Sequence, residues 1–383
     1  MIKKYPFQYL PFFLIAAILV IIVSCKKDNN SNTGSTTTNG STTELNTTAT
    51  PLKLGLYESD SSIYKLLYMG VLQVGTTNLN DALIYDTGSG GVVLDASGLV
   101  PASMITSTGF NFTGDSTVVN GITITSEQAN IQYGDDSNSI TTVYGNLAYA
   151  SVTLGDATDG KVVIKRLPFF LYYKGVDSKG NKLPAHYFDI MGVSPQYDIT
   201  FSNGAYITSP FSYYVPGTGL AKGFKMAALG TSNFSLNGTY VTGVVTLGLT
   251  ASDISVASSG FTFSPLISSS GNGYIPYAKG TITYKNNKTT TGYVLFDTGT
   301  EPYSVIEDTG ATGSSQLATG SAVSVTLVSG FVYNYTTTAT ENLTIVENPG
   351  TTGGTINIMC LEYFLTGEYM INFDAQAMGL KNN

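Results

Sequence analysis

Two stretches of the sequence share one pattern, in which four apolar or aromatic residues run into an acidic turn. Residues 82–89 read ALIYDTGS, and residues 293–300 read YVLFDTGT. Each stretch follows a short strand-like segment, GVLQV from Gly70 in the first case and GTITY from Gly280 in the second. A single Asp-Thr-Gly is common at turns, but two copies in matching contexts indicate an internal repeat. The sequence therefore predicts two related lobes, each with an acidic turn at the end of a buried strand.

The rest of the chain favours an all-β fold. From about residue 52 onward, short runs rich in Val, Ile, Thr, Tyr and Phe are separated by Gly, Asn, Ser and Asp. Many short strands with frequent turn residues are typical of all-β proteins. Helical periodicity is sustained almost nowhere, and we expect short helices only at residues 251–254 and 362–365.

The composition excludes several kinds of chemistry. Of the 383 residues, 11% are charged, against about 25% in ordinary soluble proteins, and there are one histidine and two cysteines. A zinc site of three or four His and Cys ligands and a disulfide framework are therefore excluded. A serine or cysteine hydrolase would have to use His186, which we interpret as a loop residue. The net charge of −8 argues against nucleic-acid binding, although it can simply reflect solubility. We expect no metal and no cofactor.

The two acidic turns offer a chemistry that needs none of these groups. If the turns face each other, Asp86 and Asp297 lie within a few ångströms, because the glycine two residues on allows close approach. Carboxylates that close cannot both ionise, so the pair holds one proton. One carboxylate can then act as a base on water while the other polarises a carbonyl. The pattern predicts amide hydrolysis without histidine, metal or covalent intermediate.

These motifs resemble those of the pepsin-like aspartic peptidases, over about residues 68–380. The likeness includes the first hairpin, the flap, the stretch that passes beside the first acidic turn, the run that opens the second lobe, and the closing strand with its Gly-Leu ending. The corresponding segments are YMGVLQVGT at 68–76, IQYGDDS at 131–137, FDIMGV at 188–193, GVVTLG at 243–248, YMINFD at 369–374 and MGL at 378–380. The resemblance implies an all-β, bilobal fold with pseudo-twofold related lobes and a cleft between them.

The resemblance also implies roles for individual residues. Asp86 and Asp297 would be the catalytic pair. The loops around them would be supported by Thr87, Gly88, Ser89, Thr298, Gly299 and Thr300. Tyr133 and Gly134 would lie on a hairpin flap that closes over bound peptide, although Tyr133 can also be read as an ordinary strand aromatic. We interpret Asp189 as structural and Cys360 as a buried apolar side chain.

The chain also departs from the family pattern. The flap carries Asp135 and Asp136, and Val93 lies where the family has a tryptophan. Glu301-Pro302 follows the second motif, and we expect its carboxylate to raise the apparent pKa of the aspartate pair. Leu361 occupies a position that is glycine in the family, which predicts a shifted backbone beside the second acidic turn.

The N-terminus reads as a lipoprotein signal peptide over residues 1–24. Two lysines precede an apolar run from Phe12 to Val23, and small residues lead to Cys25, as in the lipobox of bacterial lipoproteins. The run is about 12 residues, shorter than the roughly 20 that span a bilayer, although an uncleaved anchor is the alternative. Cys25 would carry the lipid, and residues 25–51, rich in Ser, Thr and Asn, would form a flexible tether.

The sequence thus predicts an N-terminal lobe over residues 52–215 and a C-terminal lobe over residues 216–383. We expect a monomeric aspartic endopeptidase that cleaves extended polypeptides and is held by lipid in a bacterial cell envelope, on the periplasmic or surface face of the outer membrane. The alternatives are a catalytically impaired pepsin-fold protein that binds or inhibits a partner, and an adhesive surface β-protein. The last would leave the matched Asp-Thr-Gly turns unexplained.

Overall fold

The computed structural model describes residues 49–60, 64–134, 140–231 and 233–383. In these residues the chain is almost entirely β, and the all-β prediction is confirmed. The short helices are the 3₁₀ turns η1 (Ala102–Met104), η2 (Pro210–Tyr213) and η3 (Leu361–Leu365) and the single α-turn α1 (Pro349–Thr352). No helix among the described residues has the length and apolar character needed to cross a membrane.

The two expected helices have different outcomes. The prediction at 362–365 agrees with η3, whereas residues 251–254 form a turn and that prediction is wrong. The reason is local, because Asp253 Oδ2 accepts hydrogen bonds from the amide of Thr250 at 2.9 Å and from its hydroxyl at 2.7 Å. These side-chain bonds close a turn in place of a longer helix.

The N-terminal lobe is built on a closed ring of six strands. Each strand pairs with the next, and the last pairs with the first. In spatial order they are β2 (Lys65–Val74), β3 (Thr77–Asp86), β11 (Ile190–Val193), β4 (Gly90–Asp95), β10 (Lys161–Val176) and β9 (Thr141–Gly155). The sheet continues from β9 through β8 (Ile122–Tyr133) to β7 (Ser116–Val119). Two small hairpins join β5 (Ile105–Thr106) to β6 (Gly109–Phe110) and β12 (Ile199–Thr200) to β13 (Tyr206–Ile207).

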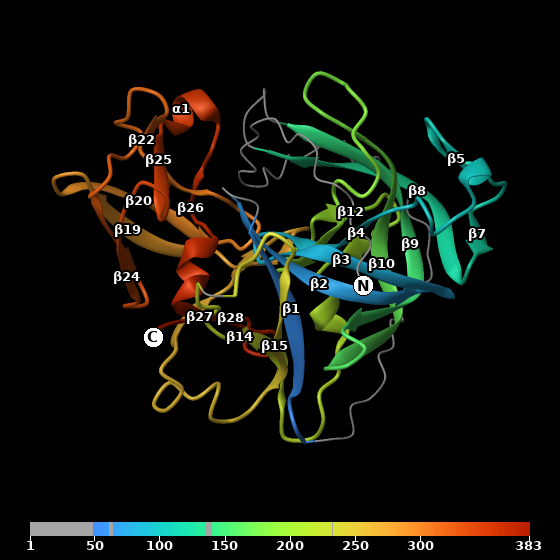
Figure 1. Cartoon of the computed structure of the whole chain (residues 1–383), viewed down its shortest axis with the longest axis horizontal. Coiled ribbons are helices and arrows are strands. Elements are labelled where there is room, and N and C mark those ends of the chain that lie inside the picture. The colour runs from blue at the N-terminus through green and yellow to red at the C-terminus, as the bar shows by residue number, and fades with distance from the viewer. Residues whose placement is uncertain (1–48, 61–63, 135–139, 232) are drawn as a thin grey trace, which may run out of the picture.

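Six further strands extend the same sheet beneath both lobes (Figure 1). They combine the first strand of the described chain with strands from its C-terminal half. Starting beside β2, they are β1 (Leu52–Asp60), β15 (Thr239–Leu249), β14 (Ala221–Met226), β27 (Gly367–Asn372), β28 (Ala377–Asn382) and β16 (Thr262–Pro265). Because segments from both ends of the chain pair here, this shared sheet ties the lobes together.

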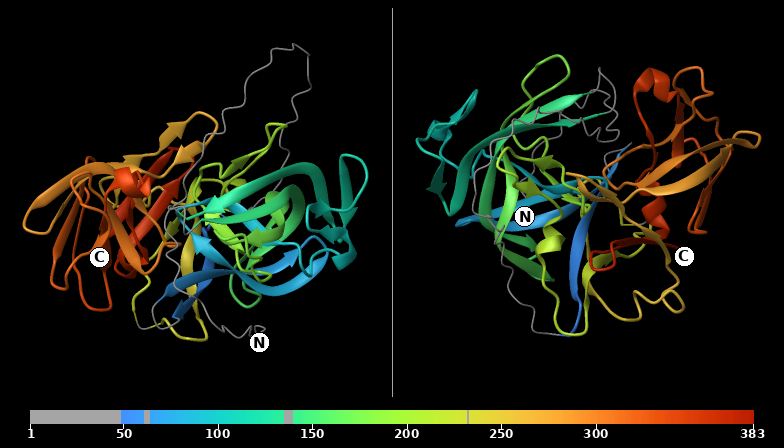
Figure 2. Two further views of the ribbon diagram at one scale, coloured as in Figure 1. Left: turned by 90° about the horizontal axis from the view of Figure 1, so that it is seen from above. Right: turned by 180° about the vertical axis from the view of Figure 1, so that it is seen from behind.

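The C-terminal lobe has its own eight-stranded sheet. In spatial order its strands are β22 (Ser315–Gln316), β25 (Leu343–Glu347), β21 (Tyr303–Glu307), β26 (Ile356–Met359), β20 (Lys288–Phe296), β19 (Ala278–Tyr284), β23 (Ala322–Leu327) and β24 (Val332–Thr336). A separate hairpin joins β17 (Ile267–Ser269) to β18 (Gly273–Ile275). Seen from above in Figure 2, this lobe and the N-terminal lobe lie side by side with β1 and β15 between them. The predicted division after residue 215 falls between η2 and β14 and stays a prediction.

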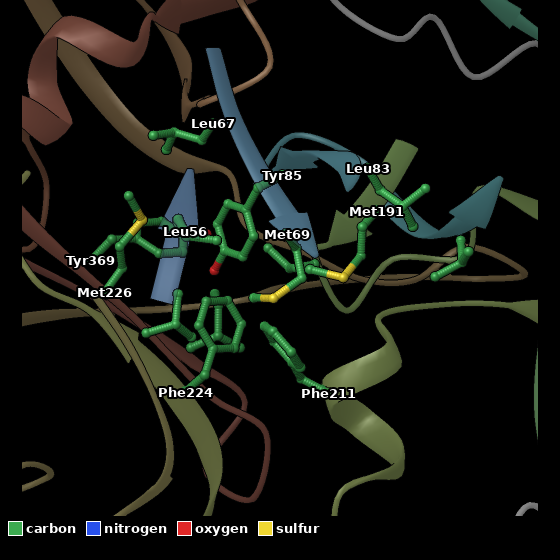
Figure 3. Packing of buried hydrophobic residues seen from close by; sticks show 14 of the residues in the cluster. Leu56, Leu67, Met69, Leu83, Tyr85, Met191, Phe211, Phe224, Met226 and Tyr369 are labelled. Atoms are coloured by element: carbon green, nitrogen blue, oxygen red, sulfur yellow. The ribbon is translucent and has the colours of Figure 1, made fainter. Parts of the chain in front are cut away.

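Buried aromatic and sulfur-containing side chains fill the space under the end of β3 (Figure 3). Tyr85 is fully buried, with its ring centroid 6.4 Å from that of Phe211. Phe211 lies 5.2 Å from Phe224, which lies 6.2 Å from Tyr369 of β27. This row of rings joins the N-terminal lobe to the shared sheet. Since Tyr85 directly precedes Asp86, the packing fixes where the first acidic turn begins.

Candidate active site

Each Asp-Thr-Gly turn follows a strand that pairs in parallel with a second strand of its lobe. β3 ends at Asp86 and pairs with β11, with Asp86 opposite Gly192. β20 ends at Phe296, opposite Met359 of β26, and the amide of Asp297 donates to the carbonyl of Met359 at 2.9 Å. Both carboxyl groups therefore emerge at the end of an interior strand, in equivalent places in the two lobes.

A reciprocal set of hydrogen bonds joins the two turns. The amide of Thr87 donates to Thr298 Oγ1 at 3.0 Å, and the amide of Thr298 donates to Thr87 Oγ1, also at 3.0 Å. The Thr87 hydroxyl in turn donates to the carbonyl of Phe296 at 2.9 Å, and the Thr298 hydroxyl to that of Tyr85 at 2.7 Å. All these groups are buried, so each bond satisfies a polar atom that water does not reach. The threonines hold the turns face to face.

The two carboxyl groups have matching hydrogen-bond donors. Asp86 Oδ1 accepts from the amide of Gly88 at 2.7 Å, and its Oδ2 accepts from the Ser89 hydroxyl at 2.5 Å. In the other lobe Asp297 Oδ1 accepts from the amide of Gly299 at 2.8 Å, and its Oδ2 accepts from the Thr300 hydroxyl at 2.5 Å. These bonds fix the orientation of both carboxyl planes before any ligand arrives.

The glycines bring each turn against the opposite carboxyl group. A Cβ atom on Gly88 would lie 2.6 Å from Cγ of Asp297, and one on Gly299 would lie 2.8 Å from Cγ of Asp86. Any side chain at either position would therefore collide with the opposite aspartate. The structure thus brings together all eight residues that the sequence places in the two turns.

The environment of the pair favours a shared proton. Asp86 and Asp297 are 8% and 5% exposed. Burial, the charge of Asp297 and a hydrogen bond between the two carboxyl groups raise the pKa of Asp86 well above its usual value. Bonds from Ser89 and Gly88 oppose this shift because they stabilise the charged form. One carboxylic acid and one carboxylate can therefore coexist here, which is what acid–base chemistry on one substrate requires.

Tyr133 ends β8, in the hairpin that β8 forms with β9, where it pairs with Thr141. Its ring stacks on Phe188 with centroids 5.2 Å apart, in the same cluster as Val93. The side chain is 6% exposed, and its hydroxyl has no hydrogen-bond partner among the described residues. Burial, followed by the charges of Asp198 and Asp86, raises its pKa. The hydroxyl is thus an unsatisfied donor near the pair. The predicted flap residues Asp135 and Asp136 lie outside the described residues, whereas Gly134 follows Tyr133 with a φ of +106°.

Two residues beside this site were not predicted from the sequence. Asp198 Oδ1 accepts from the amide of Gly90 at 2.8 Å and from Gln196 Nε2 at 3.0 Å, and burial raises its pKa to about 7. Burial and the charges of Asp198 and Asp297 raise the pKa of Tyr277. No motif marks either residue. One signal was available for Asp198, which is the sole charged residue between Asp189 and Lys222.

Glu301 does not act as expected. It is 5% exposed, and its pKa is raised to about 8 by burial and by the charge of Glu362, against the opposing charge of Lys65. Lys65 Nζ lies 2.6 Å from Glu362 Oε1, so Glu301 belongs with this ion pair between the lobes. The charge that raises the Asp86 pKa comes from Asp297. The expectation that Glu301 perturbs the pair finds no support here.

The glycine position beside the second turn is also corrected. Tyr85 pairs with Met191 and Asp86 with Gly192, while Phe296 pairs with Met359. The residue after Met359, which is Cys360, therefore stands where Gly192 stands in the other lobe. Leu361 lies one residue further on, at the start of η3, and is fully buried. The change from the family pattern thus falls at Cys360.

His186 lies in the loop between β10 and β11, as expected. Its Nδ1 is 2.7 Å from Asp189 Oδ2 and 3.9 Å from Asp81 Oδ2. Among the described residues, these three side chains form the group whose ligand atoms, within 4.8 Å of one another, are spaced for a metal ion. The hydrogen bond to Asp189 raises the His186 pKa to about 9, so an ion pair with protonated histidine already accounts for the arrangement.

Only one of the two cysteines lies among the described residues. Cys360 is a buried free thiol, and its sulfur accepts a hydrogen bond from the Ser304 hydroxyl at 3.4 Å. Burial raises its pKa, so the thiol stays neutral, in keeping with a packing role. Cys25, with the signal peptide and tether predicted before residue 49, lies outside the described residues.

The solved structures that resemble this one include an aspartic proteinase and two 7S globulins. An aspartic proteinase from Irpex lacteus superposes with a TM-score of 0.54 at 18% identity, over 87% of this chain and 98% of that chain. Basic 7S globulin from soybean superposes with a TM-score of 0.54 at 12% identity, over 86% of this chain and 96% of that one. Conglutin gamma, a basic 7S globulin from lupine seeds, gives 0.51 at 14% identity, over 87% and 96%.

No family model and no curated protein sequence matches this chain. At such low identities the structural likeness establishes the fold and leaves the activity open, since one fold serves different functions. The three structures and the sheet order agree on the architecture. The protein has the pepsin-like, bilobal, all-β fold.

Proposed function

We propose that this protein is an aspartic-type endopeptidase. The observation that supports the proposal most strongly is the buried pair Asp86 and Asp297. Each carboxyl group is oriented by its own turn and lies against the glycine of the other. Such a pair is costly to bury, because two carboxylates repel each other and lose hydration. The cost is understandable if the pair performs chemistry on a bound ligand.

The pair supplies both groups that hydrolysis of an amide needs. The ionised carboxylate takes a proton from water as the water oxygen bonds to the amide carbon. The protonated carboxyl group gives its proton to the carbonyl oxygen, forming a tetrahedral diol. The diol then collapses: the carbon–nitrogen bond breaks, the nitrogen takes the proton that the base gained from water, and a hydroxyl of the diol returns its proton to the ionised carboxylate. The products are a carboxylic acid and an amine, and the pair returns to its singly protonated state.

The substrate we propose is a polypeptide in extended conformation. The backbone groups of Gly88 and Gly299 flank the pair, and extended peptides are bound by strand-like hydrogen bonds to such backbone. Tyr133, at the end of the β8–β9 hairpin, would close over the bound chain and exclude water, and its unsatisfied hydroxyl would gain a partner there.

A second candidate is a binding or inhibitory protein without catalysis. Two observations favour it: two of the three structures named above are 7S globulins, and the Tyr133 hydroxyl has no hydrogen-bond partner among the described residues. Such a protein would bind peptides, or the peptide-like inhibitor pepstatin, and cleave none. Both acidic turns are intact, which favours the enzyme.

We further propose that the mature protein is a monomer held by a lipid on Cys25 in a bacterial cell envelope, on the periplasmic or surface face of the outer membrane. The proposal depends on the lipobox-like sequence before Cys25. Its test is the mass of the mature N-terminal peptide and membrane fractionation. Cys25→Ser should abolish the lipid mass and prevent processing.

The catalytic proposal is tested with Asp86→Asn and Asp297→Asn, each as the full chain. With a denatured protein as substrate between about pH 3 and pH 7, where carboxylate pairs titrate, we expect the parent to cleave and pepstatin to block it. Each variant should lose about 10³-fold or more in kcat/KM while keeping its fold. Asp115→Asn, at an exposed site, is the matched control and should stay active. Parent-like cleavage by both variants would refute the assignment, and pepstatin binding without any cleavage would favour the second candidate.

A further inference from the structure

A third carboxyl group is fixed against the first acidic turn. Asp198, which directly precedes β12, accepts hydrogen bonds at Oδ1 from the amide of Gly90 and from Gln196 Nε2. The same Gln196 nitrogen also donates to the carbonyl of Gly88 at 2.9 Å. Gly88 and Gly90 flank Ser89, whose hydroxyl orients Asp86. The position of the Asp198 carboxyl group is therefore tied to that of the catalytic pair.

The charge of Asp198 acts on a tyrosine of each lobe. Its charge acts on Tyr133 more strongly than the charge of Asp86 does. On Tyr277, just before β19 of the other lobe, it acts more strongly than Asp297 does. The Tyr133 ring belongs to the flap hairpin, and the Tyr277 ring lies 6.4 Å from that of Tyr293. One aromatic residue of each lobe therefore lies within electrostatic reach of the carboxyl group.

Among the described residues, no cation contributes to the pKa of Asp198. The groups that shift the pKa of Asp198 are its own burial, the Gly90 amide and Gln196, and none is a cation. Asp198 Oδ2 has no hydrogen-bond partner in the described part of the chain, and the residue keeps partial exposure. The neighbouring Tyr133 hydroxyl is buried and unsatisfied there. A partly buried carboxylate without a cation is unfavourable in the free protein, and a ligand that brings a cation reduces that penalty.

We propose that Asp198 is a specificity-determining residue that binds a lysine or arginine side chain of the polypeptide substrate close to the scissile bond. The inference rests on the proposed endopeptidase function. The Oδ2 atom would accept a charge-assisted hydrogen bond from the ammonium or guanidinium group. The faces of Tyr133 and Tyr277 would contact the alkyl stem and attract the charge. A neutral side chain of equal length would leave the carboxylate unpaired. Selectivity therefore comes both from attraction to the cation and from this penalty for a neutral side chain.

The charge state of Asp198 gives a distinctive readout. In the free protein its pKa lies at about 7, so the group is largely neutral at acidic pH and a bound cation lowers its pKa. Preference for a cationic substrate should therefore increase as the pH rises toward 7. The titratable groups around it are Asp86 after β3, Asp297 after β20, Tyr133 of β8 and Tyr277. Titration of the pair acts equally on cationic and neutral substrates, so it cancels in a ratio of their kcat/KM values.

Asp198→Asn separates charge from shape. The asparagine oxygen can still accept from Gly90 and Gln196, so the turn keeps its support while the charge disappears. The substrates are peptides that carry lysine or norleucine, and arginine or citrulline, at one position at a time on either side of the cut. At one position we expect the parent to prefer the cation by about 10- to 100-fold in kcat/KM, the range for a hydrogen bond to a charged group. Asp198→Asn should lose the preference and its pH dependence, and Asp115→Asn should keep both.

A binding measurement separates the inference about Asp198 from the proposed endopeptidase function. Asp297→Asn should bind the lysine peptide more tightly than the norleucine peptide, and the double variant with Asp198→Asn should bind both alike. If the parent cleaves peptides and Asp198→Asn keeps the full preference for cations, the inference about Asp198 is wrong and the endopeptidase stands. If Asp198→Asn slows cleavage of both peptides equally, Asp198 only positions the turn and the inference is again wrong. If no peptide is cleaved or bound by the parent, the proposed function itself fails.

Discussion

The two acidic turns orient their aspartates with equivalent glycine-amide and hydroxyl bonds, and the first adds a bond from the Ser89 amide to Asp86 Oδ1 at 3.2 Å. The turns close differently against their lobes. In the N-terminal lobe Ile190 pairs with Val93, which lies seven residues after Asp86 (93 − 86). In the C-terminal lobe the equivalent Ile358 pairs with Val305, which lies eight residues after Asp297 (305 − 297). The second turn is thus one residue longer, in the segment that contains Glu301 and Pro302.

The extra residue changes what the neighbouring strand must contribute. β11 pairs with β4 at four successive positions, whereas β26 pairs with β21 at Val305 alone. A Cβ atom on Gly192 would lie 2.5 Å from the carbonyl carbon of Ser89, so the tight side accepts glycine only. On the looser side Cys360 fits at the same register, fully buried. Glycine is therefore required only where the turn packs tightly against the neighbouring strand, while the geometry of the aspartates depends on the threonines.

The largest predicted effect concerns the equivalent positions Gly192 and Cys360. Gly192→Ala should reduce the free energy of unfolding by about 3 kcal/mol, because its Cβ meets backbone atoms that cannot move aside. Cys360→Ala should cost only about 1 kcal/mol, since it removes one buried sulfur and adds nothing. Urea or thermal unfolding at constant pH measures both. Equal losses in the two variants would mean that the two turns close alike.

The next prediction concerns the feature that the turns share. Thr87→Val and Thr298→Val should each cost about 2 kcal/mol, because each leaves a buried amide and a buried carbonyl unsatisfied. The two losses should agree to within about 1 kcal/mol, since the bonds are reciprocal. Peptidase activity should fall in both variants as the turns separate. Thr87→Ser and Thr298→Ser keep the hydroxyl and serve as controls. A marked asymmetry between the valine variants would show that one turn supports the other unequally.

A smaller effect is expected from the residue that only the second turn carries. The pKa of Glu301 is raised from 4.5 to about 8, so its contribution to stability is greatest at low pH and falls as the pH rises through about 8. Glu301→Gln removes this titration, so the variant should gain on the parent by about 1 kcal/mol between pH 5 and pH 6. Asp115→Asn is the control for the loss of one negative charge. A constant difference across this pH range would contradict the buried, protonated state of Glu301.

The smallest predicted effect concerns the hydroxyl groups that donate to the two carboxyl groups. The Ser89 hydroxyl lowers the pKa of Asp86 by stabilising its charged form. Ser89→Ala should therefore raise that pKa and move the alkaline limb of the kcat/KM profile upward by about 0.5–1 pH unit. Ser89→Thr makes the first turn identical to the second and should keep the profile of the parent. An unchanged limb in Ser89→Ala would mean that the alkaline limb reports another group.

Local pattern was sufficient for much of the site. Apolar runs ending in Asp-Thr-Gly predict buried strands with carboxyl groups at their ends, and the repeat of the pattern predicts that the two meet. The same reasoning failed at Leu361, because it aligned residues by sequence. The register of β26 against β20, which places Cys360 there instead, depends on hydrogen bonds between segments about 60 residues apart in the chain.

The sequence by itself determined the β class, the internal repeat and the eight residues of the two turns, because strand periodicity and turn chemistry are local properties. Tertiary structure alone decided that Asp198 lies beside the pair and that Glu301 faces the Lys65–Glu362 ion pair. It also decided that Tyr133 is left with an unsatisfied hydroxyl among the described residues. Those features depend on which distant segments pack together and how deeply they are buried. Burial and neighbouring charge set the pKa of an acid, and neither is visible in the residues that adjoin it along the chain.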